Sequence, residues 1–456
     1  MTPGTDITRP GINHGHPAST SNRAIPSAPP RTRPSVPTCC TAVRHASSVV
    51  PYCAGSIDCH ATMRGTRRTR ARSIRTERRQ NPHSPSKINT ASATGSRYGR
   101  MGITVGAMNG TPASAGFRMP AEWEPHVATW MQFPTGNFTF GPSGSESLDR
   151  YQRAWAAVAN AVARFEPVLV AVNPDDVDAA RDHLGEGAEI YVTAIDDAWC
   201  RDSGPTFLTD RNGGLGAVHW RFNAWGNGQY LSHDHDARVG AVIAAASGAR
   251  IFESTMVNEG GGIHVDGAGT VIITETVQLD PDRNPGWTPA QVEAELAATI
   301  GAERVIWLPR GLAKDYDEFG TSGHVDILAT FTPTGTVLVH RQNDPAHPDH
   351  AVSDEIIEVL RSSRDASGRP LRVEEMAAPA TGWTDDQPVD WSYINHYVCN
   401  GAVIMCAFDD PNDDAAAAVL ARSYPGREIV RVDARAIFEC GGGVHCITQQ
   451  VPDAQR

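Results

Sequence analysis

Four short glycine-containing segments carry the residue types that could perform chemistry. They are CRDSGP (200–205), NEGGGIH (258–264), GHVD (323–326) and ECGGGVHCITQQVP (439–452). Together they supply one thiol, Cys446, one imidazole, His324, and three carboxylates, Asp202, Glu259 and Asp326. A thiolate is a strong nucleophile, and an imidazole can carry a proton to and from a reacting group near neutral pH. These segments therefore predict nucleophilic chemistry on a substrate that tolerates several acidic neighbours.

The segment GHVD (323–326) is predicted to be a strand. Side chains alternate between the faces of a strand, so His324 and Asp326 would point the same way. By the same rule His445 would face away from Cys446, which makes His445 a poor candidate for the base. Cys446 lies close to the end of the chain, yet its surroundings are apolar and glycine-rich, which predicts that the tail is docked inside. The structural alternatives are that His324 is an ordinary strand histidine and that Cys446 is a buried, inert thiol.

Carboxylates near a thiolate raise the pKa of the thiol, so they are useful only if the substrate brings positive charge. A planar guanidinium fits this requirement, since two carboxylates can bind it bidentately with charge-assisted hydrogen bonds. Its carbon is already electron-poor, so we expect no metal and no cofactor. Trp199 and Trp123 are candidates for the walls of a substrate pocket, with core packing as the alternative for both.

The first hundred residues differ from the rest in charge. Residues 1–100 contain 16 Lys and Arg against 3 Asp and Glu, which leaves 24 against 49 in residues 101–456. The basic segment shows no apolar period, so we predict that residues 1–107 are a disordered, non-catalytic extension. A nucleic-acid-binding arm and an organellar targeting peptide are the alternatives. The acidic remainder, 108–456, is predicted to be a single catalytic domain that binds no nucleic acid.

The remainder alternates strand-like and helical segments, which is typical of an α/β fold. Predicted strands are 168–173, 270–275, 305–309 and 427–433, and predicted helices are 175–184, 288–300 and 412–426. A polar, glycine-containing cluster recurs about every 50 to 70 residues and leads into a strand, which indicates a closed radial array. The clusters lie at Trp130–Pro134, Asp202–Pro205, Glu259–His264, Gly323–Asp326 and Tyr393–Asn395, with a closing one at Gly441–Cys446.

The cysteines and the hydropathy bear on the compartment. Nine cysteines, an odd number without a C-x-x-C pair, do not form a disulfide framework or a zinc site. No stretch approaches the roughly 18 uninterrupted apolar residues of a membrane span. We therefore expect a cytoplasmic protein without a membrane contact, and we also expect a homo-oligomer.

The motifs are similar to those of agmatine deiminases, within the guanidino-group-modifying (pentein) superfamily. The resemblance covers roughly 118–452 and is carried by eight segments: MPAEWEPHVATWMQFP (119–134), WCRDSGP (199–205), NEGGGIHVDGAGT (258–270), NPGWT (284–288), GHVD (323–326), SYINHYVCNGAVI (392–404), FDDPNDD (408–414) and GGGVHCITQQVP (441–452). The resemblance implies a five-bladed α/β propeller with pseudo-fivefold symmetry. It also implies hydrolysis of agmatine to N-carbamoylputrescine and ammonia, in putrescine biosynthesis or arginine catabolism.

Carried over position by position, the resemblance implies a role for each of five residues. Cys446 matches the nucleophile and His324 the general acid and base. Asp202 and Asp326 match the carboxylates that bind the guanidinium, and Glu259 matches the carboxylate that orients the histidine. Deimination of free or peptidyl arginine and amidino transfer to an amine, both within the same superfamily, are the alternative reactions.

Overall fold

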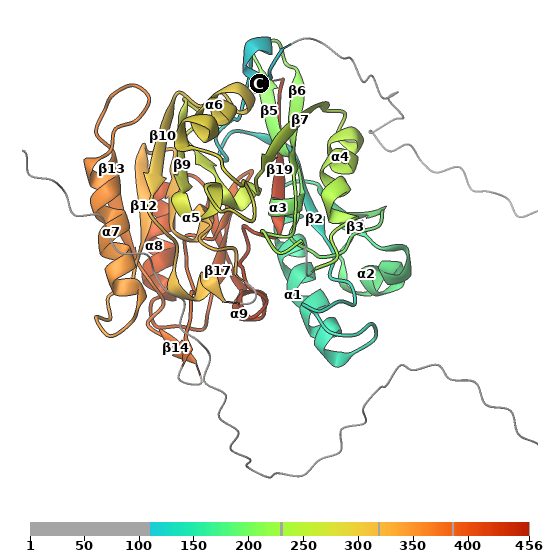
Figure 1. Cartoon of the computed structure of the whole chain (residues 1–456). Helices are drawn as coiled ribbons and strands as arrows, with labels where there is room; N and C mark the ends of the chain where they lie inside the picture. The colour runs from blue at the N-terminus through green and yellow to red at the C-terminus, as the bar shows by residue number, and fades with distance from the viewer. Residues whose placement is uncertain (1–109, 229–230, 318–319, 385–386, 456) are drawn as a thin grey trace, which may run out of the picture. The chain divides into compact units, whose positions relative to one another are not determined.

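The computed structural model describes residues 110–228, 231–317, 320–384 and 387–455. The predicted extension, residues 1–107, lies outside these ranges. Within them the predicted α/β fold is confirmed, with helices packed around several small sheets (Figure 1). No helix in the described part of the chain combines the length and the apolar character that a membrane crossing requires.

One strand arrangement recurs in five sheets of the described residues. In each, two antiparallel strands are followed by a third that runs parallel to the second. The five sets are β5 (Thr206–Asp210), β6 (Leu215–Arg221) and β7 (Arg250–Val257); β8 (His264–Val265), β9 (Thr270–Thr274) and β10 (Arg304–Leu308); β11 (Ala329–Phe331), β12 (Thr336–Arg341) and β13 (Arg372–Ala377); β16 (Tyr397–Cys399), β17 (Ala402–Ala407) and β18 (Glu428–Asp433); and β19 (Thr448–Pro452), β2 (His126–Gln132) and β3 (Val168–Val172).

Other strands extend these sheets or lie outside them. β1 (Phe117–Arg118) pairs with β5, β4 (Ala188–Val192) pairs with β3, and β14 (Trp383–Thr384) pairs with β15 (Gln387–Pro388).

Helices connect the second and third strands of each set, as a parallel crossover requires. They are α1 (Glu146–Val162), α4 (Asp236–Ala246), α5 (Glu275–Gln278) with α6 (Pro289–Thr299), α7 (Asp349–Ser362) and α8 (Asp413–Ser423). The remaining helices are α2 (Val177–His183), α3 (Cys200–Ser203) and α9 (Arg435–Phe438), and the 3-10 turns are η1 (Ala113–Ala115), η2 (Pro174–Asp176), η3 (Gly260–Gly262), η4 (Ala313–Tyr316) and η5 (Val325–Ile327).

The end of the chain is built into the fold. β19 pairs antiparallel with β2, so that Gln449 lies opposite Trp130, and the two strands lie side by side in Figure 1. The predicted docking of the tail is thus confirmed. Because Cys446 comes two residues before β19, its backbone is anchored rather than frayed.

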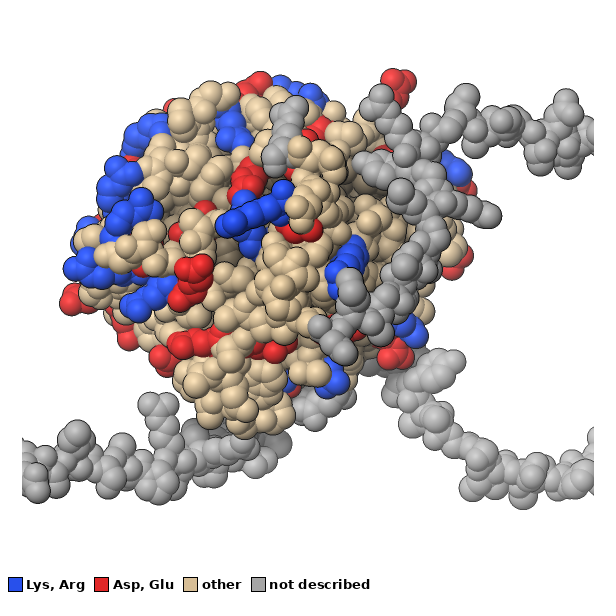
Figure 2. Space-filling model, turned by 90° about the horizontal axis from the view of Figure 1, so that it is seen from above, with Lys and Arg blue, Asp and Glu red and all other residues tan. Residues whose placement is uncertain are grey.

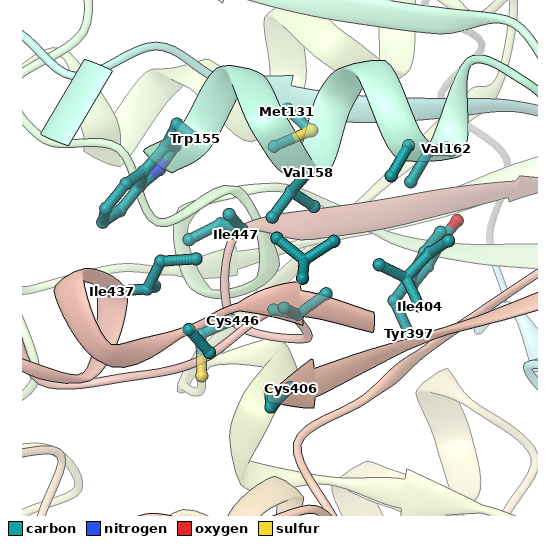
Figure 3. Close-up of a cluster of buried hydrophobic side chains, with 14 of the residues drawn as sticks. Met131, Trp155, Val158, Val162, Tyr397, Ile404, Cys406, Ile437, Cys446 and Ile447 are labelled. Carbon is teal, nitrogen blue, oxygen red and sulfur yellow. The ribbon is translucent and has the colours of Figure 1, made fainter. Parts of the chain in front are cut away.

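The apolar face of α1 covers the segment that carries Cys446. Ser145 caps the helix by accepting a hydrogen bond from the Leu148 amide at 3.1 Å. Trp155 and Val158 are fully buried in a cluster that also contains Ile447. Figure 3 shows Cys446 at the margin of this cluster, with its sulfur directed away from Val158. Burial of each large side chain here stabilises the fold by about 1.5–3 kcal/mol. Moving the Cys446 thiol would disrupt this packing and so destabilise the fold.

The surface carries both charges close together. In the face shown in Figure 2, Lys and Arg gather toward one edge, with Asp and Glu among them. Ion pairs near α7 are examples: Arg310 lies 2.8 Å from Glu355, and Arg361 lies 2.6 Å from Glu375. Such exposed pairs contribute at most about 1 kcal/mol each.

Candidate active site

The structure brings all five predicted site residues together. Asp202 lies in α3, Glu259 directly precedes η3, His324 directly precedes η5, Asp326 lies within η5, and Cys446 lies in the turn before β19. Each position comes at the start of one repeated set, just before its first strand. Five of the six predicted clusters lead into these strands, but the prediction is wrong for Trp130–Pro134, which overlaps β2, the second strand of its set. All five side chains are buried.

The sulfur of Cys446 contacts two polar side chains. It lies 3.3 Å from Oδ2 of Asp326 and 3.2 Å from Nδ2 of Asn395. Burial raises the pKa of the Cys446 thiol well above its ordinary value, and the charges of Asp326 and Asp202 raise it further. Without a cation nearby, the residue is therefore a thiol rather than a thiolate.

His324 is held between carboxylates. Its Nε2 lies 3.2 Å from Oε2 of Glu259, and its Nδ1 lies 3.8 Å from Oδ1 of Asp202. Burial alone would lower the pKa of His324, but Asp202, Glu259 and Asp326 outweigh it and raise the pKa to about 9. The imidazole is thus protonated at neutral pH, and Nδ1 has no hydrogen-bond partner among the described residues.

The prediction that GHVD forms a strand is wrong. His324 precedes the 3-10 turn η5, and β11 begins only at Ala329. The reason is Asp315, a buried carboxylate that accepts hydrogen bonds from the amides of Gly323 at 2.6 Å and His324 at 3.1 Å. These bonds occupy the backbone donors that a sheet would need, and they curl the segment toward the site.

Glu259 is fixed by a buried guanidinium. Nε of Arg283 lies 3.1 Å from both oxygens of Glu259, and Nη2 of Arg283 donates to the carbonyl of Thr321 at 2.7 Å. Burial would raise the pKa of Glu259, but Arg283 and His324 lower it to about 2. Glu259 is therefore an anion, and it orients His324 through Nε2.

Among the described residues, the hydrogen-bond donors to Asp202 are both neutral. Trp225 Nε1 donates to its Oδ2 at 2.9 Å, and the amide of Gly261 donates to its Oδ1 at 3.0 Å. Burial raises the pKa of Asp202 to about 6, although the charge of His324 opposes this shift. Gly261 is needed here, because a Cβ on it would lie 2.6 Å from Nδ1 of His324, 2.9 Å from Asp202 and 3.0 Å from Asp326.

His445 does not face away from the site as expected. Residues 444–447 form a turn rather than a strand, so the alternation rule does not apply to them. Nδ1 of His445 lies 2.8 Å from Oδ2 of Asp326, the same oxygen that Cys446 contacts. The exclusion of His445 as the base still fits the geometry, since His324 is the histidine with an unpaired nitrogen toward Asp202.

A cavity of about 1000 Å³ opens onto this cluster. Asp202, Cys446 and Trp199 are among its lining residues, and Trp199 packs edge-on against Trp155 at 5.5 Å. Trp123 is not among them. It packs partly buried against two hydrophobic clusters of the core, so the core-packing alternative holds for this residue.

Sequence reasoning missed four residues of the site. Asn395 contacts the thiol, Trp225 binds Asp202, Arg283 binds Glu259, and Asp315 holds the His324 segment. The repeat could have identified Asn395, which ends the predicted cluster Tyr393–Asn395, a cluster without an assigned role. No pattern marked the other three, because their contacts are made between distant loops.

Comparison with known proteins agrees with this arrangement. A sequence profile described as Porphyromonas-type peptidyl-arginine deiminase matches residues 118–452. The chain belongs to this family. Its family relatives include an agmatine deiminase of Pseudomonas aeruginosa, 39% identical over 365 residues, which cover 75% of this chain and 97% of that protein. The resemblance inferred from the motifs is thereby confirmed.

Two further relatives in the family are matched over almost their whole length. A protein of Streptomyces avermitilis that provisionally carries the name agmatine deiminase is 54% identical over 344 residues, 75% of this chain and 99% of its own. The solved agmatine deiminase of Enterococcus faecalis superposes with a TM-score of 0.72 at 31% identity, covering 76% of this chain and 98% of the other.

Proposed function

We propose that this protein is an agmatine deiminase, which hydrolyses agmatine to N-carbamoylputrescine and ammonia. The observation that carries the proposal is that Cys446 and Asp202 line an acidic cavity. Asp326, His324 and Glu259 are buried beside them and are connected to them through the contacts Cys446–Asp326, Asp202–His324 and His324–Glu259. The relatives named agmatine deiminase support the same reaction.

The guanidinium end of the substrate fits between Asp202 and Asp326. Each carboxylate can accept charge-assisted hydrogen bonds, which contribute about 1.5–3 kcal/mol apiece. Oδ1 of Asp326 has no hydrogen-bond partner among the described residues, so it retains an acceptor for this purpose. Trp199, on the cavity wall, offers an aromatic surface to the flat cation.

The remainder of the cavity favours an amine over a carboxylate. Besides Asp202, the described lining residues include Asp196, Asp197, Asp236 and Asp317, and they include no Lys or Arg. Agmatine ends in an ammonium group, which this lining attracts. Free arginine carries a carboxylate as well, which would find no cation here and would meet like charges.

The bound cation prepares the first step. Its positive charge lowers the pKa of Cys446, and the thiol loses its proton to water in the cavity. The thiolate attacks the guanidinium carbon, forming a C–S bond and a tetrahedral adduct beside Asp202 and Asp326. His324 then gives its Nδ1 proton to one nitrogen, the C–N bond breaks, and ammonia leaves a cationic thiouronium on Cys446.

The second step returns the enzyme to its starting state. Neutral His324, oriented by Glu259, takes a proton from water, and the resulting hydroxide adds to the thiouronium carbon. The C–S bond breaks while the hydroxyl of the adduct gives its proton to water, so the ureido product departs and Cys446 is released as a thiolate. Once the cation has left, the thiolate takes up a proton from water, which restores the starting thiol. His324 acts as acid and then as base. Its Nδ1, which forms no hydrogen bond with any described residue and lies 3.8 Å from Asp202, serves both transfers.

A substrate panel tests the proposal. We expect ammonia release from agmatine with kcat/KM at least about 100-fold above that for free arginine or a peptidyl arginine, since an unpaired buried charge costs a few kcal/mol. The assay should include an acceptor amine, so that an amidinotransferase would reveal itself by a guanidino product. Equal rates with arginine, or product formation only with the acceptor, would contradict the proposal.

The pH profile should be bell-shaped. The dependence of kcat/KM reports groups of the free enzyme, and here these are Asp202, with a pKa of about 6, and His324, with a pKa of about 9. Below the first value Asp202 loses its charge and recognition falls; above the second His324 loses the proton that the leaving nitrogen needs. Because Glu259 raises the pKa of His324, Glu259→Gln should move the alkaline limb to lower pH. If the alkaline limb stays at the same pH in Glu259→Gln, His324 is not the general acid.

Further features belong to the same proposal. We infer that the five repeated sheets are the blades of a propeller, with the clusters before β5, β8, β11, β16 and β19 converging on its axis. The single catalytic domain 108–456, the homo-oligomer, the cytoplasmic location, the absence of a cofactor and the role in putrescine synthesis stay predictions.

A further inference from the structure

His445 lies between two carboxylates beneath the site. Its Nδ1 is 2.8 Å from Oδ2 of Asp326, and its Nε2 is 2.8 Å from Oε1 of Glu122. The imidazole and both carboxylates are at most 4% exposed. Only the doubly protonated ring can donate to both carboxylates at once, so the geometry is that of an imidazolium bridge.

The other charged or titratable groups around His445 balance this bridge. Arg201 lies 3.4 Å from Glu122 and also donates Nε to the carbonyl of His445. His264 lies 3.7 Å from the second oxygen of Glu122, and its ring centre is 6.4 Å from that of His445. His396 is another buried imidazole that acts on His445 electrostatically. Two anions, Glu122 and Asp326, thus face two cations, Arg201 and protonated His445.

The two carboxylates proposed to bind the guanidinium differ in this respect. Asp202 receives hydrogen bonds from the neutral donors Trp225 and Gly261, and burial raises its pKa. Asp326 is just as buried, and burial alone would raise its pKa too, yet the contact with His445 lowers it. A buried carboxylate beside Asp202 would otherwise take up a proton and lose its use as a cation ligand.

We propose that His445 is a positioning residue that, protonated between Glu122 and Asp326, keeps Asp326 ionised and aims its Oδ2 at the sulfur of Cys446. The inference rests on the proposed deimination. The ring nitrogens of His445 bind Asp326 and Glu122, so in this proposal His445 acts on the reaction through Asp326. It explains why a histidine stands next to the nucleophile although His324 transfers the protons.

The unmodified chain provides the first test. Labelling histidine carbonyls with ¹³C and cysteine amides with ¹⁵N isolates the His445–Cys446 peptide, since His-Cys occurs once in the sequence. The signal of this peptide assigns the ring of His445, and ¹⁵N NMR should show that both ring nitrogens are protonated at pH 7. A neutral ring at pH 7 would overturn the proposal without any substitution.

Two variants divide the charge from the hydrogen bond. In His445→Asn the amide replaces Nδ1 and still donates toward Asp326, whereas in His445→Gln it replaces Nε2 and reaches Glu122. Both remove the positive charge. With ¹³C-labelled aspartate, and with Asp326→Asn to assign the signal, we expect the carboxyl pKa of Asp326 to rise by about 1 unit or more in both variants.

A matched control and a kinetic measurement complete the experiment. His347, a buried histidine 3.6 Å from Asp349 and 3.0 Å from the carbonyl oxygen of Gly382, provides His347→Gln, which should leave the pKa of Asp326 unchanged because neither partner belongs to the site. For agmatine, kcat/KM of His445→Asn should fall by about 10-fold or more with native circular dichroism. An unshifted Asp326 signal in folded His445→Asn would refute the inference. If the unmodified enzyme ignores agmatine, the proposed function fails, but the NMR result still decides the role of His445.

Discussion

Cys446→Ser is expected to lose at least about 10⁴-fold in kcat for agmatine, because a serine hydroxyl lacks the reactivity of a thiolate and nothing at the site deprotonates it. Burial and the charges of Asp326 and Asp202 already raise the pKa of the thiol well above its ordinary value. An alcohol in the same place would stay fully protonated even beside the substrate cation. Ammonia release under single-turnover conditions measures the loss.

The same variant should keep its fold and its ligand. The serine oxygen can retain the hydrogen bond from Asn395, so we expect a change in unfolding free energy below about 1 kcal/mol. Calorimetric binding of agmatine should survive. Cys399→Ser is the matched control, since Cys399 is also buried but its thiol donates to the carbonyl of Ala402, which is not a residue of the site. Residual turnover in Cys446→Ser close to that of Cys399→Ser would remove Cys446 from the role of nucleophile.

The order of strands and helices was predictable because each signal is local. The Thr288 cap followed by Pro289 predicted α6, and the apolar run at 168–172 predicted β3. The polar clusters were predictable for a different reason: their recurrence implied equivalent positions before equivalent strands. The recurrence therefore predicted that Asp202, Glu259, His324, Asp326 and Cys446 meet, and the resemblance to agmatine deiminases implied their roles.

The failures share a physical cause, which is that a rule for regular structure was applied to turns. Alternation placed His324 and Asp326 on one face and His445 on the other, but η5 and the turn at 444–447 are not strands. In both turns, backbone donors bind side chains elsewhere, Asp315 in the first and Asn395 in the second. These partners lie nine and 50 residues away in the sequence, and no periodicity predicts them.

Trp123 shows a different limit. An aromatic residue near a motif can line a pocket or fill the core, and composition does not distinguish the two. The structure packs Trp123 against the core and gives the cavity wall to Trp199 and Trp225. Trp225 adopts a left-handed backbone with φ of 57°, as does Ala224 with 54°. Such strain persists only where packing enforces it, and here it delivers the indole N–H to Asp202.

Asp326→Asn is expected to lower kcat/KM for agmatine by about 10²–10⁴-fold, mostly through recognition of the cation, since one to two charge-assisted hydrogen bonds disappear. An amide also removes the anion that His445 and His324 face, so both imidazoles should lose protons at lower pH. The alkaline limb of the profile should therefore move down together with the loss of affinity. Steady-state kinetics across pH measure both effects.

The control for this substitution is Asp410→Asn. Asp410 is also largely buried and accepts backbone hydrogen bonds from Ala380 and Thr381 at 2.8 Å, but it is not among the residues of the site. It should alter stability without altering kcat/KM. If Asp326→Asn instead keeps near-native kcat/KM, the guanidinium is not held by two carboxylates. Asp202 alone would then have to bind it. Because the charge of Asp326 contributes to the raised pKa of Asp202, the acid limb of this variant should also move to lower pH.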